Sequence, residues 1–184
     1  MTSFTTLHAA LQQYADSAPA QVAVAAQFLD FFHSHPDVFL RRHPPGHFTG
    51  SAWLVSADGQ RVLLTHHRKL GRWFQPGGHA DGDSNLMRVA LREAEEESGL
   101  VDLVVEPAIF DLDRHLIPAR GAEPAHWHYD VRFVVRATAS EAFAVCEESL
   151  DLAWRPVADL VTDEALDASI RRMARRWLAR VAGR

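Results

Sequence analysis

Acidic residues recur along one segment of the chain in a pattern that could hold a metal ion. Glu93, Glu96 and Glu97 are separated by three and four residues, so on a helix their Cβ atoms would lie about 5–6 Å apart. Three like charges at that separation repel one another, and the repulsion grows as the local dielectric constant falls. Divalent cations that prefer oxygen ligands relieve it, whereas zinc prefers histidine and cysteine. We therefore expect a site for Mg²⁺ (or Mn²⁺).

The helical positions of these glutamates separate them from ordinary surface charges. At about 100° per residue, they share one broad stripe with the apolar residues that a surface helix buries, namely Leu86, Val89, Ala90 and Leu100. Arg88, Arg92 and Glu95 fall on the opposite side, as solvated charges do. Carboxylates in the last turn are also disfavoured by the helix dipole, so a bound cation would explain their presence. A solvated acidic helix end is the alternative.

Signals for the start and the end of a helix flank the glutamates. Residues 76–78 read Pro-Gly-Gly and predict a turn ahead of the helix. Asp83 or Ser84 can then cap the first helical turn. Gly99 suits the position just past the last turn. The sequence therefore predicts a helix that begins after the caps and ends before Gly99.

Residues 78–100 resemble the Nudix box, in which a glycine is followed, after a spacer, by R-E-U-x-E-E-x-G-U with U apolar. Gly78 is followed at the matching distance by residues 92–100, which read R-E-A-E-E-E-S-G-L. A chance match to so many fixed positions in one chain is rare. The resemblance extends more loosely from Ser51 to Trp154. It implies an α/β fold, a Nudix-like α/β/α sandwich with a mixed sheet.

The resemblance also implies roles for the residues of the box. Nudix enzymes hydrolyse a diphosphate linkage in a nucleoside diphosphate joined to another group, with the help of divalent cations. By resemblance, Glu96 and Glu97 are metal ligands, and Glu93 is a ligand or the base that deprotonates the attacking water. The carbonyl of Gly77 would be a further ligand, and Arg92 would hold the helix to the preceding loop through a salt bridge.

One position departs from the family pattern. Ser84 stands where the family has a glutamate, six residues after the glycine. In the family, that glutamate usually positions the other residues of the box and does not take part in the reaction. We therefore expect its loss to change the reaction rate and the affinity for metal more than the type of reaction. Asp81 and Asp83 are close enough in sequence to replace it.

A second acidic pair lies late in the chain. Many Nudix enzymes have an additional metal-binding or basic glutamate on a loop at about this point, so the resemblance makes Glu148 or Glu147 a candidate helper. An exposed acidic loop is the alternative.

Basic and aromatic residues near the glycine turn are candidates for binding a substrate. Arg68, Lys69 and Arg72 could contact phosphate oxygens, and Trp73 could stack on a base. His79 follows the glycine turn directly and is another candidate. A solvated loop is the alternative for the basic residues, and core packing for the tryptophan.

Histidine is the second informative residue type, with 11 in the chain. His126, His128 and Asp130 alternate, so a strand would put all three on one face. Such a spacing can bind a transition metal. A polar strand face that lines a pocket or meets solvent is the alternative.

Composition narrows the class of protein. With 184 residues, 47% of them apolar, the chain can bury one core. A net charge of −5 argues against binding extended nucleic acid, although a small-molecule diphosphate needs only a local basic pocket. The lone Cys146 excludes an intramolecular disulfide and suits a reducing compartment. Because neither an export signal nor a membrane-spanning run is recognisable, we expect a cytoplasmic protein that inserts in no membrane.

Two regions of the chain differ in pattern. Residues 1–46 predict a helical extension, with helices near residues 5–14 and 20–32. We expect it to pack on a Nudix hydrolase domain formed by residues 47–184. A lid or the contact of a homodimer is an alternative role for the extension.

The domain itself shows strand and helix patterns in turn. A hairpin is expected at residues 51–65, followed by the box helix. Later strands are expected at residues 103–110, 129–137 and 152–155, and a final helix starts near Thr162. Without the resemblance, an α+β arrangement would fit almost as well as α/β.

The leading hypothesis is a Mg²⁺-dependent Nudix pyrophosphohydrolase that cleaves a small-molecule diphosphate by metal-activated water. Ser84 supports an alternative, a catalytically weakened Nudix-like domain that binds a nucleotide or a protein. An isoprenoid diphosphate isomerase, known on a related fold, would need a cysteine acid or base, and Cys146 lies far from the expected region.

Overall fold

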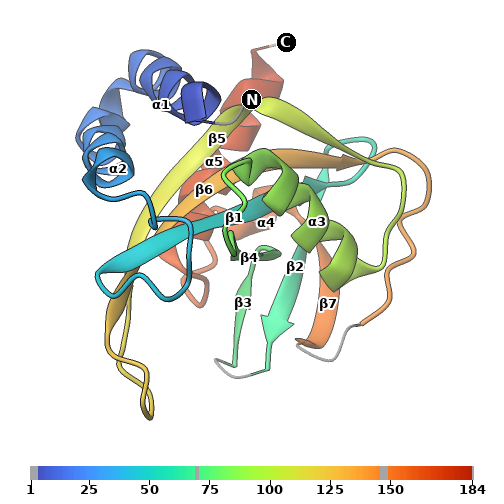
Figure 1. Ribbon diagram of the computed structural model, residues 1–184. Coiled ribbons are helices and arrows are strands. Elements are labelled where there is room, and N and C mark those ends of the chain that lie inside the picture. Colours follow the sequence, from blue (N-terminus) through green and yellow to red (C-terminus); the bar gives the residue numbers. More distant parts are fainter. Residues whose placement is uncertain (1–3, 69–70, 146–148, 184) are drawn as a thin grey trace. The chain divides into compact units, whose positions relative to one another are not determined.

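The computed structural model describes residues 4–68, 71–145 and 149–183. The helices are α1 (Phe4–Ser17), the 3-10 helix η1 (Pro19–Gln21), α2 (Val22–Ser34), α3 (Leu86–Ser98), α4 (Val157–Leu160) and α5 (Ala168–Ala182) (Figure 1). The strands are β1 (Gly46–Val55), β2 (Arg61–His67), β3 (Arg72–Phe74), β4 (Gly77–His79), β5 (Leu103–Ile117), β6 (His126–Ala137) and β7 (Ser149–Pro156).

The chain forms two compact units. The first unit consists of Met1–Ser51, Gly77–Ala90 and Glu106–Phe133. The second unit consists of Ala52–Pro76, Leu91–Val105 and Val134–Arg184. In the described part of the chain, no helix is long and apolar enough to span a membrane.

The described strands belong to one sheet, in which β1 holds a central place. The order along the sheet is β3-β2-β1-β6-β5, and β4 pairs with β1 while β7 pairs with β2. Every residue of β1 is buried. The predicted hairpin is confirmed, because β1 and β2 pair antiparallel with Val55 opposite Val62. Sequence patterns missed the three-residue strands β3 and β4, which are too short to show a period.

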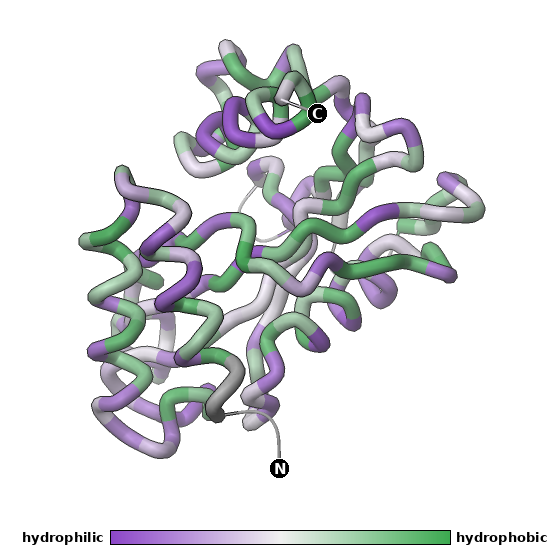
Figure 2. Tube along the Cα trace, turned by 90° about the horizontal axis from the view of Figure 1, so that it is seen from above, coloured by the Kyte–Doolittle hydropathy of each residue, from purple (hydrophilic) through white to green (hydrophobic). Residues whose placement is uncertain are grey.

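The later strands and the final helix are confirmed with different bounds. Each of β5, β6 and β7 extends beyond its predicted range. The final helix begins at Ala168 instead of near Thr162, because Asp167 caps it by accepting a hydrogen bond from the backbone nitrogen of Ser169 (2.8 Å). Figure 2 shows hydrophobic and hydrophilic residues mixed along this helix, which ends near the C label. Its buried residues are Ser169, Ile170, Met173, Ala174 and Trp177.

Helix α2 packs in the first unit through aromatic side chains. Phe31 stacks on Tyr129 of β6, with ring centroids 3.8 Å apart and planes nearly parallel. Phe28 lies against Phe48 of β1, with ring centroids 6.1 Å apart. All four rings are buried, and each such pair adds about 0.5–1.5 kcal/mol to the free energy of burial. The helices predicted in residues 1–46 are therefore present, and α2 contributes to a hydrophobic core.

A buried guanidinium joins two strands of the first unit. Arg132 on β6 contacts three carboxylates: Asp130 (Nε to Oδ2, 2.7 Å), Asp111 (Nη1 to Oδ2, 3.3 Å) and Asp113 (Nη2 to Oδ2, 3.3 Å). Burial alone would lower the pKa of Arg132, but the charges of the aspartates outweigh it, so the pKa is raised above its ordinary value. The cation is therefore permanent, and it ties β5 to β6.

The same network reaches β1 through hydroxyl groups. Thr49 Oγ1 and Ser51 Oγ both donate hydrogen bonds to Oδ1 of Asp130, at 2.9 and 2.7 Å. Because buried polar groups need partners, these two bonds fix the position of β1 relative to β6. The sequence patterns gave no sign of this network.

Helix α3 begins after Asn85, not after the predicted caps Asp83 or Ser84. The Oδ1 atom of Asn85 accepts a hydrogen bond from the backbone nitrogen of Arg88 (3.2 Å), the position that an N-cap serves. Asp83 instead accepts from the backbone nitrogen of Asn85 (2.9 Å) and pairs with both Nε and Nη2 of Arg88 (2.7 and 2.8 Å). It therefore orders the turn that leads to the cap.

Replacing Arg132 with methionine should strongly destabilise the protein. The variant leaves two fully buried carboxylates and a third, partly buried one without their cation, and loss of one partner from a buried ion pair costs about 3–5 kcal/mol. Urea unfolding followed by circular dichroism measures the effect. Arg42→Met is the matched control, because Arg42 is 75% exposed and lies 3.6 Å from Asp37. Equal stability of the two variants would contradict the assigned role of the network.

Removal of the Asn85 cap should destabilise the protein by a smaller amount. Asn85→Ala is expected to lower the free energy of unfolding by about 1 kcal/mol, whereas Asn85→Asp retains an acceptor oxygen and should be nearly neutral. Thermal unfolding of both variants and the wild type makes the comparison. If alanine and aspartate had the same effect, the cap would not be the cause.

Candidate active site

Helix α3 places the predicted glutamates at different depths. Glu93 and Glu97 are half-buried, next to the buried Ala94 and Ser98, and Glu95 is exposed as expected. Glu96 differs from the expectation, because its side chain is 63% exposed. Its position lies at the edge of the buried stripe, beyond the reach of the packing that covers Glu93 and Glu97.

Arg92 contacts two of these carboxylates. Its Nη2 atom lies 2.8 Å from Oε1 of Glu93, and its Nε atom lies 4.0 Å from Oε1 of Glu96. The Arg92 side chain is 37% exposed, so it lies along the helix surface instead of pointing fully into solvent. A cation between two carboxylates reduces their mutual repulsion, so Arg92 helps to hold the acidic side chains together.

Core packing fixes the half of α3 that carries the glutamates. Leu91 and Ala94 join an apolar cluster of the second unit that includes Ala52, Leu54, Leu63, Leu100, Leu103, Val135, Ala137 and Leu152. The predicted helix stop at Gly99 is confirmed: its φ is +66°, and its backbone nitrogen donates to the carbonyl of Glu95 (2.8 Å). The helix therefore ends where the local signal indicates.

The glycines ahead of α3 belong to the first unit, where they form β4. Gly77 pairs with Ser51 and Gly78 with Gly50, both on β1. A Cβ atom at Gly77 would overlap Oγ of Ser51, so only glycine fits beside the hydroxyl that Asp130 holds. The role of the Gly77 carbonyl as a metal ligand stays a prediction.

Gly50 allows the first turn of α3 to approach β1. A Cβ atom at this position would lie 2.8 Å from the carbonyl oxygen of Leu86 and 3.0 Å from the side chain of Val89. Both contacts are closer than real Cβ atoms normally make, so a larger residue would push the helix away from the strand.

The basic and aromatic candidates of the second unit have distinct surroundings. Arg68 is exposed. Arg72 lies on β3 with Nη2 3.8 Å from Oδ2 of Asp167. Trp73 is half-buried and stacks on His66, with ring centroids 5.0 Å apart. Lys69, Cys146, Glu147 and Glu148 lie outside the described residues.

Histidines from three strands gather in the first unit. His79 of β4 and His128 of β6 each lie next to His47 of β1, with ring centroids 5.0 and 4.7 Å apart. His126 of β6 completes the group, 5.0 Å from His47. The predicted strand places His126 and His128 on one face, but sequence reasoning missed His47, because a single histidine in an apolar strand carries no spacing signal.

Burial lowers the pKa of three of these imidazoles, those of His47, His79 and His128. It lowers the pKa of His47 to about 3, with further contributions from His79 and His126. It lowers the pKa of His128 to about 2, helped by the nearby His47 and His79. The pKa of His79 is lowered as well, first by burial and then by Arg41. At neutral pH these rings can accept hydrogen bonds or bind metals, but they supply no positive charge to a phosphate.

Comparison with known sequences identifies a relative that matches part of the chain. A protein named putative 8-oxo-dGTP diphosphatase 3, from Mycobacterium tuberculosis (strain ATCC 25618 / H37Rv), is 31% identical over 126 residues. The match covers 63% of this chain and 55% of the relative. The chain thus spans about half the length of the curated relatives that it matches.

Solved structures with the same fold have lower sequence identity. The structure of an Ap4A hydrolase from C. elegans matches this chain with a TM-score of 0.60 and 18% sequence identity. The match covers 74% of this chain and 98% of the hydrolase chain. The MutT protein from Methanosarcina mazei Go1 has a TM-score of 0.56 at 19% identity, with coverages of 73% and 94%. These likenesses confirm the expected Nudix-like α/β fold with a mixed sheet.

A family model decides the classification. The model of the NUDIX domain matches residues 46–178, a range that contains the glycine strand, the α3 glutamates and the strands that position them. The chain therefore belongs to the Nudix hydrolase family.

Proposed function

We propose that this protein is a Mg²⁺- (or Mn²⁺-)dependent pyrophosphohydrolase that cleaves a diphosphate linkage in a nucleoside-diphosphate-linked or related small molecule. One observation carries the proposal: a family match in which Glu93 and Glu97, four residues apart, are half-buried on α3. Half-buried like charges are stabilised by nearby positive charge, which Arg92 supplies in part and a bound divalent cation would increase.

The donor atoms of α3 suit a hard cation. Glu93, Glu96 and Glu97 offer carboxylate oxygens, and neither histidine nor cysteine occurs in the helix, so the set favours Mg²⁺ over Zn²⁺. We propose that the three glutamates of α3 hold the ion, while the roles of the Gly77 carbonyl and of Glu148 as further ligands stay predictions from the family resemblance. When bound, the ion neutralises diphosphate charge and lowers the pKa of a bound water.

The remaining chemistry belongs to the side chains. Glu93 accepts a proton from the attacking water, and Arg92, 2.8 Å away, orients its carboxylate. The water oxygen forms a bond to phosphorus as the bridging P–O bond breaks, and the leaving phosphate departs. The proposal requires no covalent intermediate with the protein.

Substrate binding is proposed for residues on and beside β3 in the second unit and, separately, for His79 of β4 in the first unit. Arg68 and Arg72 are exposed and can approach phosphate oxygens. The ring of Trp73, with one partner in His66, can extend its stack to a base. His79 is half-buried and can accept a hydrogen bond from a substrate hydroxyl or amine.

The names of the relatives suggest nucleoside polyphosphates as substrates. The mycobacterial relative is named for 8-oxo-dGTP, and the nematode structure for Ap4A. Both ligands combine a purine base with a phosphate chain, which suits one aromatic ring and several arginines. Residence in the cytoplasm completes the proposal.

Glu97→Gln should remove activity without unfolding the protein. The amide has the shape of the carboxylate but no charge, so we expect kcat to fall about 100-fold or more. The assay separates the phosphorylated products by chromatography, with Mg²⁺, over a panel that contains 8-oxo-dGTP, Ap4A, ADP-ribose and dihydroneopterin triphosphate.

Glu95→Gln is the matched control, because Glu95 is exposed on the opposite side of the same helix. It should retain wild-type activity. A wild type that binds a panel member by calorimetry and hydrolyses none would instead support the alternative, a weakened binding domain. Equal loss in the two variants would refute the assignment of Glu97.

A further inference from the structure

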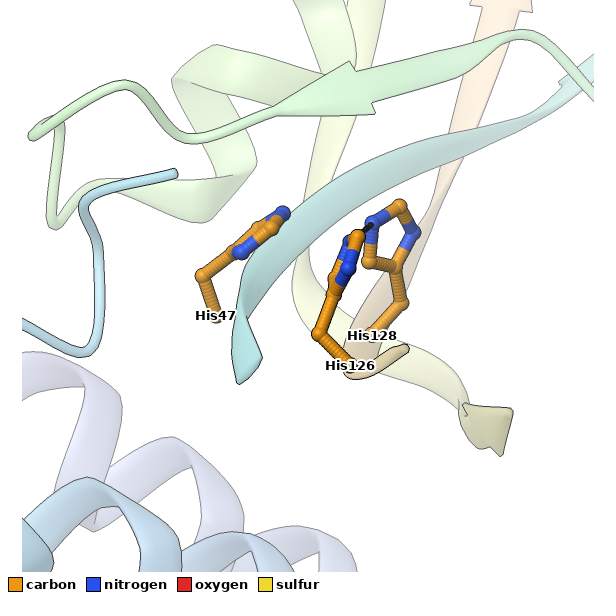
Figure 3. A group of neighbouring side chains, drawn as sticks. All are labelled: His47, His126 and His128. Carbon is orange, nitrogen blue, oxygen red and sulfur yellow. Dashed lines mark hydrogen bonds between the residues drawn. The ribbon is translucent and has the colours of Figure 1, made fainter. Parts of the chain in front are cut away.

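The histidine cluster of the first unit shares no residue with the glutamate set, and it has the features of a separate metal site. One ring nitrogen from each of His47, His126 and His128 lies within 4.8 Å of the others. Figure 3 shows the ring of His47, on β1, directed toward those of His126 and His128, on β6. Two adjacent strands thus bring three imidazoles to one point.

The separation of two ring nitrogens matches tetrahedral zinc. The Nε2 atoms of His126 and His128 are 3.3 Å apart (Figure 3). Two nitrogens about 2.0–2.1 Å from a tetrahedral zinc ion are about 3.3–3.4 Å apart. In the absence of an ion, a hydrogen bond between the two rings also fits this distance. The same positions of His126 and His128 therefore suit the metal-bound and the metal-free protein.

The orientation of His126 favours metal binding. Its Nδ1 atom lies 2.9 Å from the carbonyl oxygen of Pro124, which can only accept a hydrogen bond, so Nδ1 carries the proton. The lone pair of His126 is therefore on Nε2, the atom that faces His128. A backbone carbonyl that fixes the tautomer of a histidine in this way is a regular feature of zinc sites.

His47 supplies an independent reason to expect a ligand. Its side chain is fully buried, and neither Nδ1 nor Nε2 has a hydrogen-bond partner in the described structure. A buried polar group without a partner is costly, and a metal ion bound by one of the two nitrogens would satisfy it.

We propose that His47, His126 and His128 form a binding site for one Zn²⁺ ion, with the fourth coordination position open. Three protein ligands with an open position are typical of zinc ions that take a water or a substrate atom. The ring of His79 lies beside the cluster, with its centroid 5.0 Å from that of His47 and 5.2 Å from that of His128. The site is chemically distinct from the carboxylate site for Mg²⁺.

Metal titration of the full chain without a histidine tag tests the proposal. After treatment with EDTA, the protein should bind one equivalent of Zn²⁺ in calorimetry. Co²⁺, added as a spectroscopic probe, should give the strong visible absorption of a tetrahedral complex, and Zn²⁺ should displace it. A tenfold excess of Mg²⁺ should not displace Co²⁺. Failure to bind either transition metal, or weak octahedral-type Co²⁺ spectra, would overturn the proposal.

Variants separate this site from other histidines and from the glutamates. His126→Gln and His128→Gln should each weaken Zn²⁺ binding about 100-fold or more. Glu97→Gln should leave it unchanged, so failure of the proposed hydrolase function is distinguishable from failure of the zinc site. The exposed His33 supplies the matched control, His33→Gln, which should bind as tightly as the wild type.

Nuclear magnetic resonance of the wild type covers the case in which a variant fails to fold. Ring nitrogen signals of His47, His126 and His128 should shift when one equivalent of Zn²⁺ is added, while those of His33 and His66 stay in place. Shifts confined to surface histidines would show that the buried rings only pack against one another, and the proposal would be wrong.

Discussion

The buried contact between Arg132 and its three aspartates is the interaction on which the first unit depends. It holds β5 and β6 together, and through Asp130 it fixes the hydroxyls of Thr49 and Ser51 on β1. Ser51 in turn leaves room only for glycine at residue 77. The Arg132 guanidinium thus helps to determine the position of β4, which contains Gly77. A buried charge tolerates few arrangements of its partners. The same strands, β1 and β6, carry the histidine cluster.

The two candidate metal sites differ in donor chemistry and in the way they are built. Glu93, Glu96 and Glu97 are a local set of oxygen donors, because helical spacing makes them neighbours on α3. Three imidazoles form a nitrogen set that depends on the pairing of β1 with β6. Oxygen donors select hard cations and imidazoles select late transition metals. The two proposed sites therefore differ in ligand type, which is the property that separates hard cations from late transition metals.

Local patterns predicted the elements better than their ends. The hairpin at Val55 and Val62 and the helix stop at Gly99 follow from short-range chemistry, so sequence reasoning found both. The start of α3 was misplaced, because Asp83, Ser84 and Asn85 are all good caps and only the backbone path selects Asn85. Glu96 was placed in the buried stripe, but it is exposed at the edge, since packing covers a narrower arc than the helical period suggests.

The sequence by itself determined the family and the box glutamates, because helical spacing and a run of fixed residue types are properties of neighbouring residues. It also placed His126 and His128 on one face of a strand. Only the tertiary structure added His47 as the third member of their cluster and Arg132 as the cation among Asp111, Asp113 and Asp130. These groups join residues from separate strands, and strand pairing, which no local pattern of residues specifies, decides which side chains meet.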